Sequence, residues 1–120
     1  MRESPRPTVY YDGACPLCRR EIGLYRACRG AEVIDWVDVA SVDRPAADLA
    51  RADALARFHM RTGDGRLVSG AAAFLELWRS LPGWRLAAAL LSVPPLPWLL
   101  ERCYRLFLRV RPAIARRLPR

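Results

Sequence analysis

The chain has 120 residues, which is enough for one domain with an extension but not for two full-sized cores. With 52% hydrophobic and 27% charged residues, it has the composition of a globular protein and not of a disordered one. All 20 basic residues are arginine, which excludes catalysis by lysine, and the formal net charge of +8 indicates an acidic partner or surface.

The positive charge is unevenly distributed along the chain. Residues 1–78 hold 11 arginines and 11 acidic residues, whereas residues 79–120 hold nine arginines and a single acid, Glu101. We therefore interpret residues 1–78 as a core domain, whose last helix continues to about residue 81, and residues 79–120 as a basic helical extension packed on it. This division predicts that the excess charge lies away from the chemistry of the core.

The sequence predicts a cytoplasmic protein, peripheral to a membrane at most. The first residues contain no apolar segment followed by a cleavage site, so we expect no signal peptide. The longest uncharged stretch, residues 86–100, is interrupted by three prolines and is shorter than the roughly 20 residues of a membrane span. In the cytoplasm a close cysteine pair is catalytic or metal-binding and not structural.

The first half of the chain reads as strand, helix, strand. Thr8–Tyr11 is a short run of β-branched and aromatic residues that ends at Asp12 and Gly13. From Pro16 a helical pattern continues to about Arg29, with Gly30 as its stop. The alternation in residues 33–39 predicts the second strand.

The second half adds a helix, a hairpin and further helices. We expect a helix over residues 46–56, two strands (57–62 and 66–69) around the turn Gly63-Asp64-Gly65, and a helix over residues 71–81. Two more helices, 84–91 and about 98–111, flank a proline cluster. The order is β-α-β-α-β-β-α plus helices, an α/β fold. Because of Pro112 and Pro119 we expect the end of the chain to be poorly structured.

The segment Cys15-Pro16-Leu17-Cys18 lies at the first strand-to-helix junction and favours thiol redox chemistry. With Cys15 at the N-cap and Pro16 at the first helical position, the Cys15 sulfur faces unpaired backbone N–H groups and the positive end of the helix dipole. Both stabilise a thiolate, and Arg19 and Arg20 add positive charge. Cys18 lies one turn further along and is more shielded. We therefore expect Cys15 to attack and Cys18 to resolve the mixed disulfide.

Asp12 and Gly13 precede this pair. The Asp12 carboxylate is positioned to take or deliver a proton for Cys18, directly or through water. The alternative is that Asp12 caps the turn or the helix through its side chain. Gly13 permits a tight turn.

Other uses of the cysteines have weaker support. Structural zinc needs four ligands, and the remaining candidates, Cys28, His59 and Cys103, are isolated in the sequence. Haem attachment needs a histidine where Arg19 stands. We therefore predict no metal and no cofactor, and we interpret Cys28 and Cys103 as small core residues. Cys103 belongs to an apolar helical face that we expect to be buried, with Leu106, Phe107 and Val110.

The pattern Asp12-Gly13-x-Cys15-Pro16-x-Cys18-x-x-Glu21, directly after a strand, resembles the DCC family of thiol–disulfide oxidoreductases. That family is named for an Asp, a Cys and a Cys, which match Asp12, Cys15 and Cys18. Phe58-His59-Met60, Gly63-Asp64-Gly65 and Leu81-Pro82-Gly83 resemble later parts of the family, so the likeness covers nearly the whole chain. It implies a thioredoxin-like fold. One difference is that thioredoxins carry a cis-proline just before the third strand, where this chain has Ala56-Arg57-Phe58.

The sequence therefore predicts a thiol–disulfide oxidoreductase that acts on a protein or small-molecule thiol or disulfide and exchanges electrons with a second redox partner. The alternative is a non-catalytic membrane-surface or protein-interaction module that acts through the basic C-terminal helices. In that reading Arg102, Arg105 and Arg109 face anionic lipid beside Trp98. Otherwise these arginines form the solvated face of a helix packed on the core. Nucleic acid is disfavoured, because the charge comes without a recognised binding motif.

Overall fold

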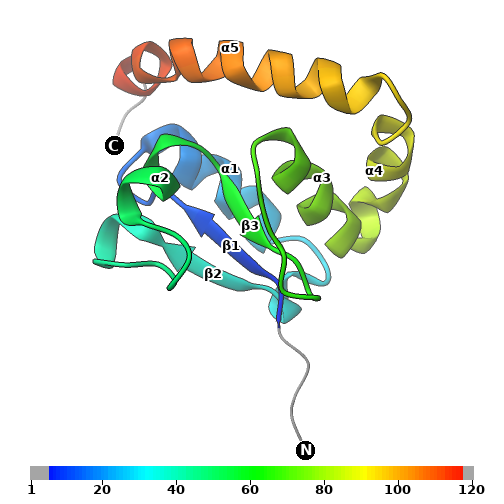
Figure 1. Cartoon of the computed structure of the whole chain (residues 1–120), viewed down its shortest axis with the longest axis horizontal. Coiled ribbons are helices and arrows are strands. Elements are labelled where there is room, and N and C mark those ends of the chain that lie inside the picture. The colour runs from blue at the N-terminus through cyan, green and yellow to red at the C-terminus, as the bar shows by residue number, and fades with distance from the viewer. Residues whose placement is uncertain (1–5, 118–120) are drawn as a thin grey trace, which may run out of the picture.

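The structure is a computed structural model that describes residues 6–117. Its centre is a four-stranded sheet in the order β2-β1-β3-β4 (Figure 1), formed by β1 (Thr8–Tyr11), β2 (Asp35–Asp38), β3 (His59–Arg61) and β4 (Leu67–Ser69). Strands β1 and β2 are parallel, with Tyr11 opposite Asp38. The pairs β1–β3 and β3–β4 are antiparallel.

Within the described residues, five α-helices accompany the sheet: α1 (Pro16–Arg26), α2 (Arg51–Ala56), α3 (Ala71–Ser80), α4 (Arg85–Leu91) and α5 (Leu96–Arg117). The observed order β-α-β-α-β-β-α, followed by α4 and α5, is the thioredoxin-like arrangement that the resemblance implied. The predicted fold class is confirmed.

The core lies on both faces of the sheet, because neighbouring strand residues point to opposite sides. Val9 and Met60 point to one side, where they pack with residues of α1 and α3 such as Ile22 and Leu77. Tyr10 points to the other side and packs with a smaller cluster formed by Val39, Leu49 and Ala54. Helices α1 and α3 thus cover one face, and α2 covers part of the other.

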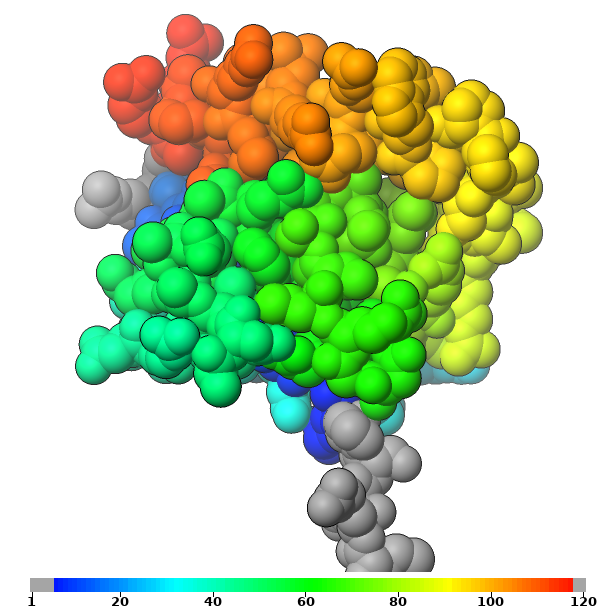
Figure 2. Space-filling model, viewed as in Figure 1, coloured from blue at the N-terminus to red at the C-terminus, as the bar shows by residue number. Residues whose placement is uncertain are grey.

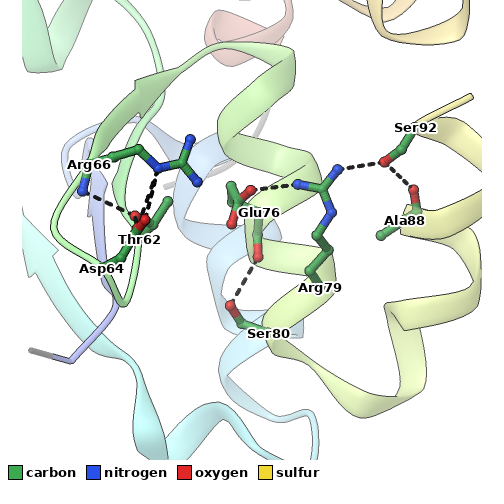
Figure 3. A network of polar contacts seen from close by, with 8 residues as sticks. All are labelled: Thr62, Asp64, Arg66, Glu76, Arg79, Ser80, Ala88 and Ser92. Atoms are coloured by element: carbon green, nitrogen blue, oxygen red, sulfur yellow. Dashed lines mark hydrogen bonds and ion pairs between the residues drawn. The ribbon is translucent and has the colours of Figure 1, made fainter. Parts of the chain in front are cut away.

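The hairpin between β3 and β4 forms as predicted. Gly65 has a φ of 94°, a left-handed value that glycine adopts without strain, and Thr62 N–H donates to the Arg66 carbonyl at 2.8 Å. The Asp64 carboxylate binds the Thr62 hydroxyl and the Arg66 guanidinium at the tip of the hairpin (Figure 3).

A polar network joins α3 to the chain that leads into α5. The Arg79 guanidinium pairs with Glu76 on its own helix and donates to the Ser92 hydroxyl at 2.7 Å (Figure 3). The Ser92 hydroxyl in turn donates to the Ala88 carbonyl at 2.6 Å. These bonds fix the direction in which the chain leaves α4.

The strands β2 and β3 are shorter than predicted, and two helices are several residues shorter. Helix α1 ends at Arg26 and not near Arg29, because the chain turns there into a 3₁₀ segment that begins after Gly30, whose φ is 93°. The predicted helix over residues 46–56 begins only at Arg51. Residues 46–49 form a tight turn, closed by an isolated bridge between Ala46 and Leu49, which brings Leu49 into the smaller cluster.

Helix α5 differs from the prediction at its C-terminal end. It does not end at Pro112 but continues to Arg117, although a proline there removes one helical hydrogen bond. The Arg111 guanidinium, on the side of α5 that faces the core, donates a hydrogen bond to the Leu55 carbonyl at 3.1 Å. This bond holds the C-terminal end of α5 on the core. Pro119 lies outside the described residues.

The buried face of α5 is also not the predicted one. Cys103, Leu106 and Val110 are exposed, whereas Tyr104 is buried. The helix is rotated so that the face carrying Glu101, Tyr104 and Arg111 meets the core.

Helix α5 runs over the edge of the molecule where β1 ends and β3 begins (Figure 1). No helix within residues 6–117 is both long and apolar enough to cross a bilayer.

Candidate active site

The turn between β1 and α1 is held by the Asp12 side chain. Asp12 Oδ1 accepts a hydrogen bond from Ala14 N–H at 3.0 Å, and the Asp12 carbonyl accepts one from Cys15 N–H at 3.3 Å. This is the side-chain turn that aspartate favours at such positions. The capping alternative for Asp12 therefore has direct structural support.

Gly13 is required by a close approach and not by an unusual φ. Its N–H donates to Asp38 Oδ1 at 2.9 Å, and a Cβ atom at this position would overlap the Asp38 carboxylate. Asp38 reaches the turn because β2 is parallel to β1 and ends beside it. The same oxygen accepts from Ala40 N–H at 3.0 Å, so Asp38 joins two loops at the carboxyl end of the sheet.

Cys15 occupies the N-cap of α1, as the sequence predicts. Its backbone is extended, with φ −86° and ψ 120°, and Pro16 follows at the start of the helix. The Cys15 sulfur accepts a hydrogen bond from Cys18 N–H at 3.4 Å. The sulfur thus lies against the N-terminal amides of the helix, where the dipole favours negative charge.

Cys18 faces the interior of the site. Burial, a hydrogen bond with the Cys15 side chain and the charge of Cys15 raise the pKa of the Cys18 thiol to about 12. The positive charge of Arg111 acts in the opposite direction, and Asp12 adds a smaller upward contribution. The Cys18 thiol is therefore protonated at neutral pH, and it needs a proton acceptor before its sulfur can react.

A cavity of about 40 Å³ adjoins Cys18, which is room for roughly two or three water molecules. Its polar lining residues come from the end of β1, from α1, from the segment before β3 and from α5: Asp12, Cys18, Glu21, Arg57, Tyr104 and Arg111. Phe58, Phe74 and Phe107 supply much of its apolar wall. The arginine-rich extension thus forms one side of the site, which corrects the expectation that its charge lies away from the chemistry.

Besides the bond from Arg111 to the Leu55 carbonyl, Tyr104 and Glu101 fix helix α5 over the cavity. Phe58 N–H donates to the Tyr104 hydroxyl oxygen at 2.6 Å. Glu101, the single acid of the extension, pairs with Arg57 at 2.9 Å and with Arg105 at 2.8 Å, and it also accepts from Ala71 N–H at 3.2 Å.

The remaining predicted residues lie around this centre. Arg19 and Arg20 are exposed on the first turn of α1. Cys28, half-buried, packs against the main core cluster, and Cys103 is exposed on α5. Within residues 6–117 no three His, Cys, Asp or Glu side chains gather in a way that would hold a metal ion.

Sequence reasoning gave no role to five residues of the site: Glu21, Asp38, Arg57, Tyr104 and Arg111. Glu21 had a signal, because it stands three residues after Cys18 and so on the same side of a helix. Asp38 had a weaker one, as a polar residue at the end of a predicted strand. For Tyr104 and Arg111 the residue pattern around them gave no such signal, because their approach to Cys18 depends on the rotation of α5.

Comparison with known proteins shows the family of the chain. The family model described as DCC1-like thiol-disulfide oxidoreductase matches residues 9–117. The chain belongs to the DCC1-like thiol-disulfide oxidoreductase family. The match includes α5, so the basic extension is part of what the family model describes.

Among curated proteins, the chain is similar to an uncharacterized chloroplastic protein of Arabidopsis thaliana. The two are 32% identical over 93 residues, which is 69% of this chain and 44% of the relative. The chain thus spans less than half the length of that relative. No solved structure matches the chain significantly.

Proposed function

We propose that this DCC1-like protein catalyses thiol–disulfide exchange, with Cys15 as the nucleophile and Cys18 as the resolving thiol. One observation carries the assignment: the Cys15 sulfur lies at the N-terminus of α1, 3.4 Å from the Cys18 amide nitrogen, whereas Cys18 faces the internal cavity. Both cysteines are half-buried. The sulfur at the helix N-terminus is suited to the first attack, and the neighbour that lines the cavity is suited to the second.

The reaction proceeds in two displacements. The Cys15 thiolate attacks one sulfur of a substrate disulfide, which forms a mixed disulfide and releases the first substrate thiol. Cys18 then loses its proton and attacks the Cys15 sulfur, so that the second substrate thiol leaves. The substrate disulfide is reduced to two thiols, and the protein dithiol is oxidised to a Cys15–Cys18 disulfide. A dithiol or thiol partner reverses the steps and restores the reduced protein.

The surrounding residues support this arrangement. Pro16 begins α1 and Gly13 lets Asp38 fasten the turn, so both hold Cys15 at the N-cap. Arg19 and Arg20 supply positive charge beside the pair, which favours thiolates and anionic substrates. Asp12 lies close enough to influence Cys18, which makes it one candidate for the proton carrier predicted from the sequence. The cytoplasmic localisation stays a prediction.

The test uses single cysteine variants in a background that lacks Cys28 and Cys103. Cys15→Ser is expected to abolish disulfide reduction, and Cys18→Ser to accumulate a mixed disulfide with the substrate, detected by intact mass. Equal partial losses in the two variants would contradict the assigned roles. The absence of a Cys15–Cys18 disulfide in thiol buffers across about −100 to −300 mV would contradict the exchange itself.

A second function is favoured by the outer surface of α5 and is compatible with the first. The apolar residues Leu99, Leu106, Val110 and Ile114 are between 38% and 63% exposed and recur at helical spacing. Figure 2 shows α5 along the outer edge of the molecule. We name this set of four the apolar stripe.

Arginines run beside the apolar stripe. Arg102, Arg105 and Arg109 are exposed at spacings of three and four residues, and Arg102 lies over the Trp98 ring, 4.7 Å from its centroid. An apolar stripe with an adjoining row of cations suits the interface of an anionic bilayer, where side chains enter the headgroup region and arginines meet phosphates. We propose that α5 attaches the protein to anionic membrane surfaces.

Flotation with phosphatidylcholine vesicles, with and without about 30% phosphatidylglycerol, tests this attachment. The protein is expected to float only with the anionic vesicles, and Leu106→Asp or a triple Arg102/Arg105/Arg109→Gln variant to remain at the bottom. Arg29→Gln and Arg44→Gln, which change exposed arginines elsewhere, serve as controls. Flotation that is unaffected by the α5 substitutions would contradict the attachment.

A further inference from the structure

Glu21 is a carboxyl group at the site to which the exchange mechanism gives no role. It stands three residues after Cys18 on α1, and residues at this spacing are neighbours on one side of a helix. Both side chains line the cavity of about 40 Å³. Glu21 and Cys18 therefore face the same small, water-sized space.

Hydrogen bonds with Tyr25 and Trp78 set the orientation of the Glu21 side chain. The Tyr25 hydroxyl donates to Glu21 Oε1 at 3.2 Å, and the Trp78 indole N–H donates to the Tyr25 hydroxyl at 3.1 Å. This chain of bonds holds one carboxylate oxygen. Oε2 makes no hydrogen bond within residues 6–117, so it is available to a water molecule in the cavity.

Cys18 needs a proton acceptor. Burial and the neighbouring Cys15 raise the pKa of Cys18 far above neutral pH, so resolution requires removal of the proton as the sulfur attacks. Burial raises the pKa of Glu21 above its usual range, with the Tyr25 hydrogen bond acting against the rise. A carboxyl group whose pKa is moved towards neutrality is a better match for such a transfer than an exposed one.

Asp12 is the competing carboxyl group at the cavity. Its Oδ1 is already bonded to Ala14 N–H, and this bond shapes the turn before Cys15. Asp12 thus holds a backbone turn, whereas the one hydrogen bond of the Glu21 side chain within residues 6–117 is with the Tyr25 side chain.

We propose that Glu21, and not Asp12, carries the proton of Cys18 through water in the cavity. The proposal rests on the exchange function proposed above. In the resolving step the Cys18 S–H proton passes by way of a water molecule to the Glu21 carboxylate. The Cys18 sulfur bonds to Cys15, and the bond between Cys15 and the substrate sulfur breaks. The departing substrate thiolate takes a proton from solvent or from Glu21. During reduction by a thiol partner the proton returns to Cys18.

Other ionisable groups face the same space and modulate this transfer. Besides Cys18 and Glu21, the cavity is lined by the ionisable residues Tyr10, Tyr11, Asp12, Arg57, Tyr104 and Arg111. Cys15 and Tyr25 do not line it but are bonded to Cys18 and Glu21, respectively. Arg111 favours the Cys18 thiolate and Asp12 opposes it. Because Arg57 is paired with Glu101, its charge is largely offset.

A disulfide that releases a coloured thiolate separates the two displacements. Stopped-flow mixing of the reduced protein with 5,5′-dithiobis(2-nitrobenzoate), in the background lacking Cys28 and Cys103, gives a first release from attack by Cys15 and a second from resolution by Cys18. Glu21→Gln keeps the size of the side chain and an acceptor for Tyr25. It is expected to leave the first phase within about twofold and to slow the second phase at least about tenfold at pH 7.

The pH profile distinguishes proton transfer from a structural effect. In the wild type the second phase is expected to slow as pH falls through the raised pKa of Glu21, because protonated Glu21 no longer accepts a proton. This acid limb is expected to disappear in Glu21→Gln. Glu32→Gln, a change at an exposed glutamate, is the matched control and keeps the wild-type profile.

Three results would overturn the proposal. The first is a Glu21→Gln protein with an unchanged second phase. The second is an Asp12→Asn protein with an equal or greater loss in that phase and with the acid limb removed. The third is a wild-type protein that makes only the first release, which would refute exchange through Cys18 and this proposal together. The first two leave the exchange function intact.

Discussion

The backbone N–H of Phe58 donates a hydrogen bond of 2.6 Å to the hydroxyl oxygen of Tyr104, 46 residues further along the chain. Phe58 directly precedes β3, the position at which thioredoxins carry their cis-proline. Here this backbone donor is occupied by the protein's own C-terminal helix. Helix α5 therefore completes the cysteine site, although it follows the core in sequence and carries the excess of positive charge.

Removal of the Tyr104 hydroxyl is expected to loosen α5. Tyr104→Phe leaves the Phe58 N–H without its partner, which costs about 1–3 kcal/mol for a buried donor. The free energy of unfolding from urea titration measures this loss. Alkylation of Cys18 in a Cys15→Ser background is expected to be faster in the variant. An unchanged free energy together with unchanged alkylation would show that the bond does not hold α5. Thr8→Val, at a half-buried hydroxyl of β1 that does not line the cavity, is the control.

Glu101 is expected to make the docking of α5 sensitive to acid. Burial opposes ionisation, but hydrogen bonds from Arg105, Ala71 N–H and Arg57 together lower the pKa of Glu101. A carboxyl group with a lowered folded-state pKa contributes stability above its usual range and loses it as pH falls through the lowered value. Glu101→Gln is therefore expected to reduce the free energy of unfolding at pH 7 and to weaken its decline between about pH 5 and 3. Parallel curves for variant and wild type would contradict this.

Glu21 is expected to reduce stability at neutral pH. Because its pKa is raised, the folded protein binds more protons at this group than the unfolded chain does, and stability falls as pH rises between the two pKa values. Glu21→Gln should raise the melting temperature at pH 7–8 and change it little at pH 4, where the carboxyl is protonated in both states. A greater gain at pH 4 than at pH 8 would contradict the raised pKa.

Gly13 is expected to tolerate no side chain. In Gly13→Ala the new methyl group would overlap the Asp38 carboxylate, which has to move and give up its bond to the Gly13 N–H. Overpacking of this kind costs about 1–3 kcal/mol. The displaced turn is expected to slow the first displacement by Cys15, measured as the first phase of the coloured release. Gly63→Ala, where a Cβ meets no neighbour, is the control.

Much of the fold was predictable because local signals were strong. β1 matches its predicted bounds, and the glycine turn of the β3–β4 hairpin lies where expected. Helix boundaries were less accurate. The alanine-rich stretch that precedes Arg51 has helical propensity, yet the packing of Leu49 under the sheet imposes a turn there.

The sequence by itself determined the fold class and the place of Cys15 and Cys18, because a strand, an Asp-Gly break and a proline-started helix are local features that put Cys15 at an N-cap. Only the tertiary structure decided what surrounds Cys18. The rotation of α5 is set by the fit of Glu101, Tyr104 and Arg111 against residues that are distant in sequence, and not by its apolar periodicity. The apolar periodicity of α5 predicts that its apolar face is buried. Long-range polar bonds instead hold a different face against the core, and the apolar stripe remains exposed to solvent.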